Sequence, residues 1–282
     1  MAEPRIGGAT RVAAVVGWPV AHSLSPVLHN AAFAALEIDW TYVALPVEPG
    51  HVPEAVVGLR ALGFAGANVT MPHKEAVADA MDELAEDARR LRAVNTIELR
   101  GDRLVGHNTD APGFARFLDH DAGFEPAGKT ALLFGAGGAA RACALAVARA
   151  GLTRIVVALR EPARAGSLTA SLDGLHTEVE AIAFDDAADA TADLVVNATP
   201  LGAHGEDLPL PKLAADGLLV DLLYRPAVTR AQQAARAAGA QAFGGLGLLL
   251  HQAALSFELW TGRPAPLEVM SAAAVAALAD TA

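Results

Sequence analysis

The chain has 282 residues, of which 53% are hydrophobic and 19% charged, and its net charge is −11. This composition supports a large buried core in one or two domains, and the negative charge argues against nucleic acid or an anionic membrane as a partner. A single cysteine, Cys143, excludes an internal disulfide and is typical of a reducing compartment. Because no apolar run is long enough to span a bilayer and Met1–Gly17 lacks a leader pattern, we expect a cytoplasmic protein.

The first part of the chain alternates apolar runs with helical patterns. Ser25 followed by Pro26 predicts a helix that Ser25 caps. The turn Arg100-Gly101-Asp102 predicts a hairpin between its two flanking strands. Predicted strands cover 11–17, 41–47, 65–69, 96–99 and 103–106, and predicted helices cover 25–36 and 53–62, with two short helices between 74 and 92.

The second part of the chain, after Asp110, continues this alternation. Its strands are predicted at 129–134, 154–159, 178–183, 194–198 and 217–221, with helices at 112–119, 138–150, 247–260 and 266–279. A β-α-β alternation implies a parallel sheet with helices on both faces. The last two helices add no strand, so we expect them to pack back onto the first domain. The alanine-rich tail helix is expected to pack against the protein itself or against a second subunit, as in a homodimer.

The strand at 129–134 runs into a glycine-rich turn. Phe134-Gly135-Ala136-Gly137-Gly138-Ala139-Ala140 matches the dinucleotide fingerprint, with alanine in the last glycine place. Gly135 permits the tight turn, Gly137 lets a pyrophosphate approach the backbone, and the helix N-terminus supplies N–H groups and partial positive charge. An ordinary strand-to-helix turn is the alternative. We therefore predict a dinucleotide site formed by Gly135, Ala136, Gly137, Gly138 and Ala139.

The end of the next strand bears on the choice of dinucleotide. An acidic residue there usually accepts hydrogen bonds from the ribose of NAD, whereas arginines suit the 2′-phosphate of NADP. The sequence offers both, because Arg160 and Arg164 flank Glu161. Both cofactors stay open on these residues, and a solvated helix start is a third interpretation.

Polar residues gather after an apolar segment in Asn68-Val69-Thr70-Met71-Pro72-His73-Lys74. Pro72 ends the preceding strand because it has no N–H to give a ladder. Lys74, close to apolar residues, is a candidate proton donor or anion clamp. Taken by itself, Lys74 is also consistent with an ordinary surface lysine. Asp110 is likewise consistent with a helix cap before Pro112. The nine histidines form no metal-spaced cluster, so no metal is predicted.

Eight segments together resemble the shikimate dehydrogenase family, over nearly the whole chain. They are Gly17–Pro26, Asn68–Lys74, Ala93–Thr96, Asn108–Asp110, Gly135–Ala140, Asn197–Gly202, Asp221–Tyr224 and Gly245–Gln252. The resemblance implies an α/β fold with two domains: a substrate domain at 1–110 and 246–282, and a Rossmann-like dinucleotide-binding domain at 111–245. It also implies NADP-dependent reduction of 3-dehydroshikimate to shikimate, in aromatic amino-acid biosynthesis.

The resemblance assigns substrate roles to residues of both domains. Ser23 and Ser25 would bind the substrate carboxylate, which agrees with two hydroxyls at a helix N-terminus. Ring hydroxyls would be held by Asn68, Thr70 and Asn95, and the substrate would be covered by Tyr224 and Gln252. Lys74 and Asp110 would form the catalytic pair, facing a cleft that closes on the ligand.

The resemblance also assigns cofactor roles. Gly245 and Leu248 would border the nicotinamide, and Arg160 and Arg164 would meet the adenosine phosphate. The sequence departs from the family pattern at Leu159-Arg160-Glu161, where Asn-Arg-Thr is common, and at Gly244, where aspartate is usual. The first departure leaves the NADP preference open, and an NAD-dependent quinate/shikimate dehydrogenase is the alternative. A non-catalytic dinucleotide-binding or ligand-binding protein on the same fold is a separate alternative, against which the presence of both Lys74 and Asp110 argues.

Overall fold

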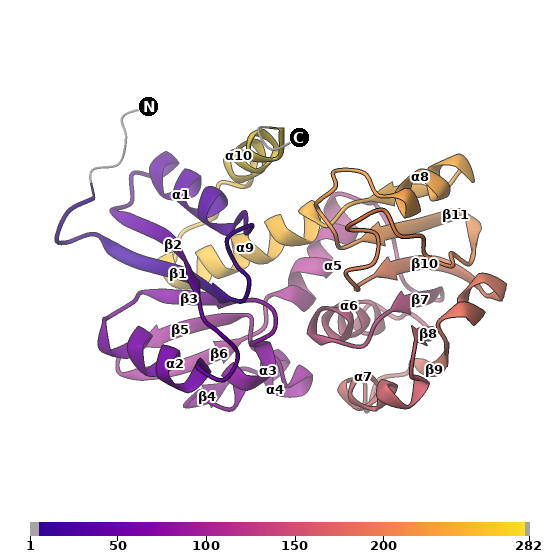
Figure 1. Cartoon of the computed structure of the whole chain (residues 1–282), viewed down its shortest axis with the longest axis horizontal. Coiled ribbons are helices and arrows are strands. Elements are labelled where there is room, and N and C mark those ends of the chain that lie inside the picture. Colours follow the sequence, from indigo (N-terminus) through magenta and orange to yellow (C-terminus); the bar gives the residue numbers. More distant parts are fainter. Residues whose placement is uncertain (1–5, 280–282) are drawn as a thin grey trace. The chain divides into compact units, whose positions relative to one another are not determined.

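The computed structural model describes residues 6–279, so the predicted substrate domain extends at both ends, 1–5 and 280–282, outside the described residues (Figure 1). The chain divides into two compact units. Unit 1 ends at Thr109 and resumes at Leu249, and unit 2 is Asp110–Leu248. The fold is α/β in both, as predicted from the alternating pattern.

Unit 1 is built on a mixed sheet whose strand order is β2-β1-β3-β5-β6-β4. The strands are β1 (Arg11–Gly17), β2 (Trp40–Pro46), β3 (Gly66–Val69), β4 (Glu83–Leu84), β5 (Thr96–Arg100) and β6 (Arg103–His107). β1 pairs in parallel with β2 and β3, whereas β5 is antiparallel to β3 and to β6. The predicted hairpin is thus confirmed. The two-residue β4 was not predicted, because a strand of that length has no periodicity to detect.

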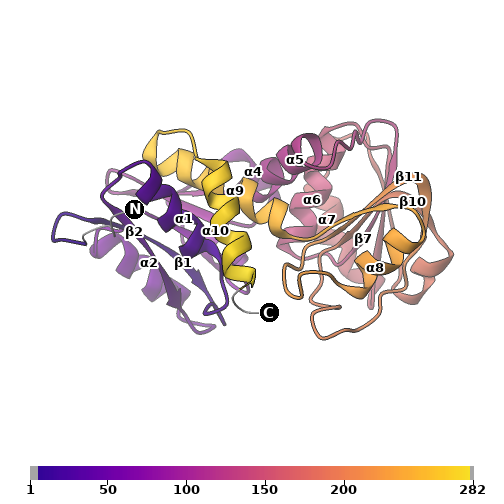
Figure 2. The same ribbon diagram turned by 90° about the horizontal axis from the view of Figure 1, so that it is seen from above.

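Six helices accompany this sheet. They are α1 (Ser25–Ala35), α2 (Val52–Ala61), α3 (Lys74–Ala78), α4 (Glu86–Leu91), α9 (Leu246–Thr261) and α10 (Leu267–Ala279). The C-terminal helices return to unit 1, as expected: α10 lies beside α1 in both views (Figures 1 and 2). Trp260 of α9 donates its indole N–H to the carbonyl of Ile97 in β5 at 3.0 Å.

The two faces of the unit 1 sheet differ in chemistry. Successive side chains of a strand point to opposite faces, so Val69 and Ile97 pack with α2 in an aliphatic cluster. Their neighbours Asn68 and Thr96 point to the other face, where they stand opposite each other in the β3–β5 pairing and bond to Ser256 of α9. Polar side chains therefore collect between this sheet and α9.

Unit 2 is an all-parallel sheet of order β12-β11-β10-β7-β8-β9, the doubly wound arrangement of a Rossmann fold. Its helices α6 and α8 lie on opposite faces (Figure 2). Its strands are β7 (Thr130–Phe134), β8 (Arg154–Leu159), β9 (Glu178–Ala183), β10 (Thr191–Asn197), β11 (Lys212–Asp221) and β12 (Gln241–Phe243). Its helices are α5 (Asp110–His120), α6 (Gly138–Arg149), α7 (Gly166–Ser171) and α8 (Arg230–Ala237), with short 3₁₀ turns at Pro162–Ala165 and Asp185–Asp189.

Two local predictions were wrong. Ser25 is the first residue of α1 rather than its cap, and no side chain caps this helix. Instead, the N–H of Ser25 donates to Oγ of Ser23 at 3.2 Å. Strand β11 begins at Lys212, five residues before the predicted 217, because its half-exposed start pairs with β10 across a register shift. Such an edge segment lacks the apolar run that identifies a buried strand.

Candidate functional site

A network of buried hydroxyl and amide groups lies between the unit 1 sheet and α9, and we call it the polar lattice. Tyr42 donates its hydroxyl hydrogen to Oδ1 of Asn68 at 2.7 Å. Nδ2 of Asn68 donates to Oγ1 of Thr96 at 3.0 Å and to Oγ of Ser256 at 2.9 Å. Each of these groups would destabilise the fold if buried without a partner. The lattice comprises Tyr42, Asn68, Asn95, Thr96, Thr109, Gln252 and Ser256, all at most 9% exposed.

Asn95 connects the lattice to the two predicted catalytic positions. Its Oδ1 accepts from the N–H of Thr109 at 2.7 Å, and its Nδ2 faces Oε1 of Gln252 at 3.5 Å. The preceding residue, Val94, donates its N–H to the carbonyl of Lys74 at 2.8 Å. Neighbouring residues of one loop thus hold the backbone of Lys74 and of Thr109, the residue before Asp110.

The predicted catalytic pair occupies two helix starts. Lys74 is the first residue of α3 and is half-buried. Asp110 is the first residue of α5 and is 6% exposed. Since Lys74 belongs to unit 1 and Asp110 to unit 2, the pairing of their side chains stays a prediction.

The predicted carboxylate-binding residues follow β1. Ser23 is half-buried and Ser25 is buried at the start of α1. Thr70 follows β3, and its N–H donates to the carbonyl of Val16 at 2.9 Å. A Cβ on Gly17 would stand 2.3 Å from the methyl of Thr70, so glycine is required for this close approach. Hydroxyl groups are therefore placed after the carboxyl ends of two adjacent parallel strands, where α/β sheets bind ligands.

Aromatic rings pack beside the polar lattice around His29 and Tyr42. The ring of His29, fully buried on α1, stacks on Tyr42 with centroids 4.4 Å apart and planes 8° apart. Burial lowers the pKa of His29 to about 3, and a contact with the Asn68 side chain opposes that shift. Burial likewise raises the pKa of Tyr42 well above its ordinary value, opposed by a hydrogen bond with Ser25. Both rings are therefore neutral near pH 7.

The predicted dinucleotide turn joins β7 to α6 in unit 2, as the fingerprint requires. Gly135 has φ +101°, a left-handed conformation that favours glycine. Gly137 immediately precedes the helix, and no atom lies within 4 Å of a Cβ built on it. Ala140 is fully buried, which allows the helix to pack closely on the sheet. The space beside Gly137 at the start of α6 is thus open, and a helix N-terminus suits a phosphate.

The residues that bear on cofactor choice lie just after β8. Arg160, Glu161 and Arg164 are all exposed, so each is accessible to a ligand. Nε of Arg164 lies 3.6 Å from a carboxylate oxygen of Glu161, one turn apart. The carboxylate therefore competes with a phosphate group for the same guanidinium.

A second buried network organises the strand ends of unit 2. Asp221, at the end of β11, accepts from Nδ2 of Asn197 at 2.9 Å and from Oγ1 of Thr229 at 2.7 Å. Burial raises the pKa of this carboxyl, and these hydrogen bonds oppose the shift. Burial also raises the pKa of Tyr224, which is half-buried three residues later. The network thereby fixes the loop that carries Tyr224.

The predicted nicotinamide-bordering residues are also in unit 2. The N–H of Gly245 donates to the carbonyl of Leu223 at 2.9 Å. A Cβ on Gly245 would meet the carbonyl oxygen of Leu222 at 2.0 Å, so no other residue fits there without backbone movement. Leu248, in the first turn of α9, is 8% exposed.

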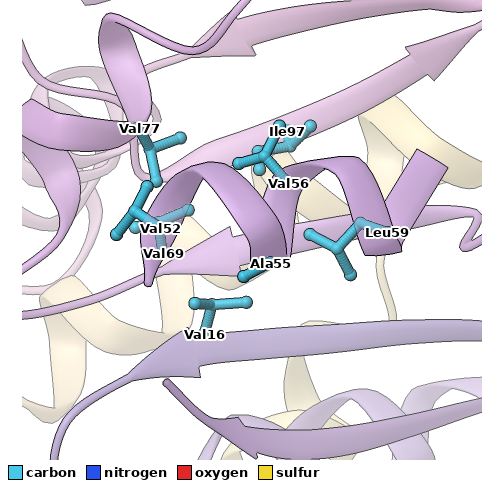
Figure 3. Close-up of a pocket in the computed structure, with 8 residues that line it drawn as sticks. All are labelled: Val16, Val52, Ala55, Val56, Leu59, Val69, Val77 and Ile97. Carbon is cyan, nitrogen blue, oxygen red and sulfur yellow. The ribbon is translucent and has the colours of Figure 1, made fainter. Parts of the chain in front are cut away.

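Two hollows among the described residues lie outside this site. One, of about 380 Å³ in unit 2, is lined by Ala115, Phe124 and Ala146 among others, and its only ionisable lining residues are Asp119 and Glu125. The other, beneath α2, is lined only by aliphatic side chains, among them Val16, Val56 and Ile97 (Figure 3). It has no room for a water molecule. Within residues 6–279, no group of three or more His, Cys, Asp or Glu side chains could hold a metal ion. None of the described helices combines the length and apolar character needed to cross a bilayer.

Sequence reasoning missed several lattice members. Thr96 and Thr109 stood inside recognised segments but received no role, and Tyr42 and Ser256 were not singled out. Ser256 follows Gln252 by four residues and so lies on the same face of α9. That spacing from Gln252 is a local signal for Ser256, although it does not indicate that Ser256 meets Asn68.

Comparison with known proteins matches both ends of the chain to shikimate dehydrogenase families. Residues 15–97 match the shikimate dehydrogenase substrate binding domain, and residues 245–275 match the shikimate 5'-dehydrogenase C-terminal domain. The shikimate dehydrogenase (NADP(+)) of Desulforamulus reducens is 43% identical over 280 residues, covering 96% of each chain.

Solved structures of shikimate dehydrogenases are also similar to this chain. The shikimate 5-dehydrogenase of Thermus thermophilus, in complex with NADP(H) and shikimate, is 39% identical with a TM-score of 0.85, covering 95% of this chain and 100% of that one. The ligand-free 5-ketofructose reductase of a Gluconobacter species is 30% identical with a TM-score of 0.86, covering 96% of this chain and 100% of that one. The fold is therefore shared with a reductase of a different substrate.

Proposed function

Since the chain belongs to the shikimate dehydrogenase family, we propose that it is an oxidoreductase that reversibly reduces 3-dehydroshikimate to shikimate with NADP, in aromatic amino-acid biosynthesis. The observation that carries this proposal is the 39% identity, over 95% of the chain, to a structure holding NADP(H) and shikimate. The polar lattice supports it, because a buried set of amides and hydroxyls suits a ligand that carries several hydroxyl groups.

On the substrate side, we assign the carboxylate of shikimate to Ser23 and Ser25, whose hydroxyls stand at the start of α1. The ring hydroxyls are assigned to Thr70 and to the lattice amides Asn68, Asn95 and Gln252. Tyr224 would add its hydroxyl from unit 2. Neutral donors and acceptors suit hydroxyl groups, whereas a helix start suits the negative charge of the carboxylate.

The proton chemistry is assigned to Lys74 and Asp110. Reduction of a ketone leaves an alkoxide, and this charge must receive a proton as it develops. The ammonium of Lys74 supplies that proton, and the carboxylate of Asp110 orients the ammonium and stabilises its charge. In the reverse direction, neutral Lys74 removes the proton from the shikimate hydroxyl. Two hydrogen bonds of neighbouring residues support this joint role. Val94 donates its N–H to the carbonyl of Lys74, and Asn95 accepts through Oδ1 from the N–H of Thr109, the residue before Asp110.

On the cofactor side, the observed turn fits a dinucleotide. The conformation of Gly135 and the open space beside Gly137 leave the first N–H groups of α6 accessible to a pyrophosphate. Arg160 and Arg164 would meet the adenosine phosphate, and Gly245 and Leu248 would border the nicotinamide. NADPH, when bound, supplies the hydride; the protein supplies orientation and electrostatics.

One observation favours an alternative cofactor. The carboxylate of Glu161 lies 3.6 Å from Arg164 and would repel a 2′-phosphate. An NAD-dependent quinate/shikimate dehydrogenase is therefore the second candidate. A non-catalytic ligand-binding protein on the same fold is the third.

A matrix of assays separates these candidates. Purified protein is mixed with shikimate or quinate and with NADP⁺ or NAD⁺, and formation of the reduced nicotinamide is followed by absorbance. We expect the highest kcat/KM with shikimate and NADP⁺. A higher value with NAD⁺, or with quinate, would replace the proposal with the second candidate. Tight binding of both ligands without hydride transfer would establish the third. The cytoplasmic location, the homodimer and the division into substrate and cofactor domains stay predictions.

A further inference from the structure

The hydrogen atoms of Asn68 can be assigned from its neighbours, because some of its contacts are to groups that only accept. The carbonyl of Asn95 only accepts, so the amide atom of Asn68 that faces it at 3.2 Å is Nδ2. Oδ1 therefore faces Tyr42, whose hydroxyl must donate at 2.7 Å. The side chain of Asn68 thus has one allowed orientation, and it is held from both ends.

Ser256 is fixed by the same reasoning. Its Oγ lies 3.0 Å from the carbonyl of Gln252, which only accepts, so the hydroxyl hydrogen is directed there. Oγ of Ser256 then accepts a hydrogen from Nδ2 of Asn68 at 2.9 Å. It also faces Oγ1 of Thr96 at 2.8 Å, whose single hydrogen is shared between Ser256 and Oδ1 of Asn95 at 3.0 Å. Ser256 therefore acts as an acceptor inside the lattice and not as a donor to a ligand.

This assignment limits what each amide can offer a ligand. Nδ2 of Asn68 has two hydrogens, and both are directed at protein oxygens. Its remaining capacity is a lone pair on Oδ1, on a side chain that the imidazole of His29 also contacts. Nε2 of Gln252 donates one hydrogen to the carbonyl of Leu249 at 2.8 Å, and its second hydrogen is not used in the lattice. A ligand hydroxyl therefore meets an acceptor at Asn68 and a donor at Gln252.

We propose that Tyr42 and Ser256 are positioning residues for the substrate: they hold Asn68 as a hydrogen-bond acceptor for a ring hydroxyl and leave donation to Gln252. This inference rests on the proposed function. Both residues are buried, at 2% and 0% exposure, so they act through Asn68 and not by direct contact. The stack of His29 on Tyr42 keeps the phenol in the orientation that the hydrogen bond needs.

The test compares Tyr42→Phe and Ser256→Ala with the wild-type enzyme. Loss of one positioning hydrogen bond should raise KM for shikimate about three- to tenfold, while KM for NADP⁺ stays within about twofold. A merely structural role would reduce the amount of active enzyme and lower kcat without this split. Ser171→Ala is the matched control, because Ser171 is a buried serine of unit 2 whose hydroxyl donates to the carbonyl of Leu168. Ser256→Thr, which keeps the hydroxyl, should restore KM.

The double variant, Tyr42→Phe with Ser256→Ala, tests whether both act on one amide. We expect its KM for shikimate to rise by less than the product of the two single effects. Independent effects, equal changes in both KM values, or an unchanged KM for shikimate would overturn the inference. If Ser256→Ala does not fold, Tyr42→Phe, which keeps the ring, decides.

Failure of the proposed function is read separately, from turnover of shikimate by the wild-type protein. Calorimetric titration of shikimate into the same variants then tests the positioning role without turnover. In each variant, Kd for shikimate should rise by the same factor as KM for shikimate. Absence of shikimate binding to the wild type would overturn both proposals.

Discussion

The buried imidazole of His29 predicts a measurable loss of stability in mild acid. Burial lowers its pKa from 6.5 to about 3, so the folded chain keeps it neutral where the denatured chain binds a proton. Stability therefore falls as pH drops below 6.5, by about 1.4 kcal/mol per pH unit from this residue. At pH 5 the loss amounts to about 2 kcal/mol. It ends near the folded pKa, below which both states are protonated.

The variant His29→Phe removes the titrating group and keeps an aromatic ring against Tyr42. Urea denaturation is followed by tryptophan fluorescence, which reports on unit 1 because Trp18, Trp40 and Trp260 all belong to it. Between about pH 7.5 and about pH 5, the wild type should lose about 2 kcal/mol more of its free energy of unfolding than the variant.

His51→Phe is the matched control, because it makes the same replacement at an exposed histidine of unit 1. It separates the effect of introducing a phenylalanine ring from the effect of removing the buried imidazole. If the curves of the wild type and His29→Phe run parallel, His29 binds its proton equally in both states, and the neutral stack on Tyr42 is refuted.

Three further substitutions test other parts of the molecule. Lys74→Ala should lower kcat for shikimate oxidation at least about a hundredfold with unchanged urea denaturation, and near-wild-type turnover would remove it from the catalytic role. Glu161→Thr should raise the ratio of kcat/KM for NADP⁺ to kcat/KM for NAD⁺ by about fivefold at low salt, because it releases Arg164 from its carboxylate partner. The increase should be smaller at high salt, which screens exposed charges. An unchanged ratio would mean that this ion pair does not govern cofactor choice. Thr229→Ala should cost about 1–2 kcal/mol in thermal unfolding, because Thr229 both caps α8 in a capping box and donates to Asp221, and an unaltered melting temperature would contradict that.

The parts of the fold that were predicted from sequence are those fixed by local pattern. The run into Gly135 is an apolar strand followed by glycines and a helix, and the structure places β7 and α6 within one residue of the predicted bounds. The hairpin of β5 and β6 follows from its turn residues. Short edge strands such as β12, Gln241–Phe243, escape prediction because three residues show no period and pairing with β11 alone defines them.

The polar lattice could be predicted only in part, because it is a product of tertiary packing. Asn68 and Asn95 were identified by the segments in which they stand. Nothing local to Ser256 indicates that it meets Asn68, 188 residues away in the chain. The contact arises because cross-strand pairing places Asn68 beside Thr96 and because α9 returns to cover that face of the sheet.

The lattice also explains why a core so rich in apolar residues keeps polar groups at its centre. Removing one member leaves its neighbours buried without a partner, at a cost of about 1–3 kcal/mol each, whereas an entirely apolar replacement would carry no such penalty. Stability alone therefore does not require Tyr42, Asn68, Thr96 and Ser256 together. What these groups add is a fixed orientation: a carbonyl that only accepts and a phenol that must donate determine which end of the Asn68 amide accepts hydrogen bonds. A family that distinguishes a ring hydroxyl from a ketone needs donors and acceptors of fixed orientation, and an apolar core cannot supply them.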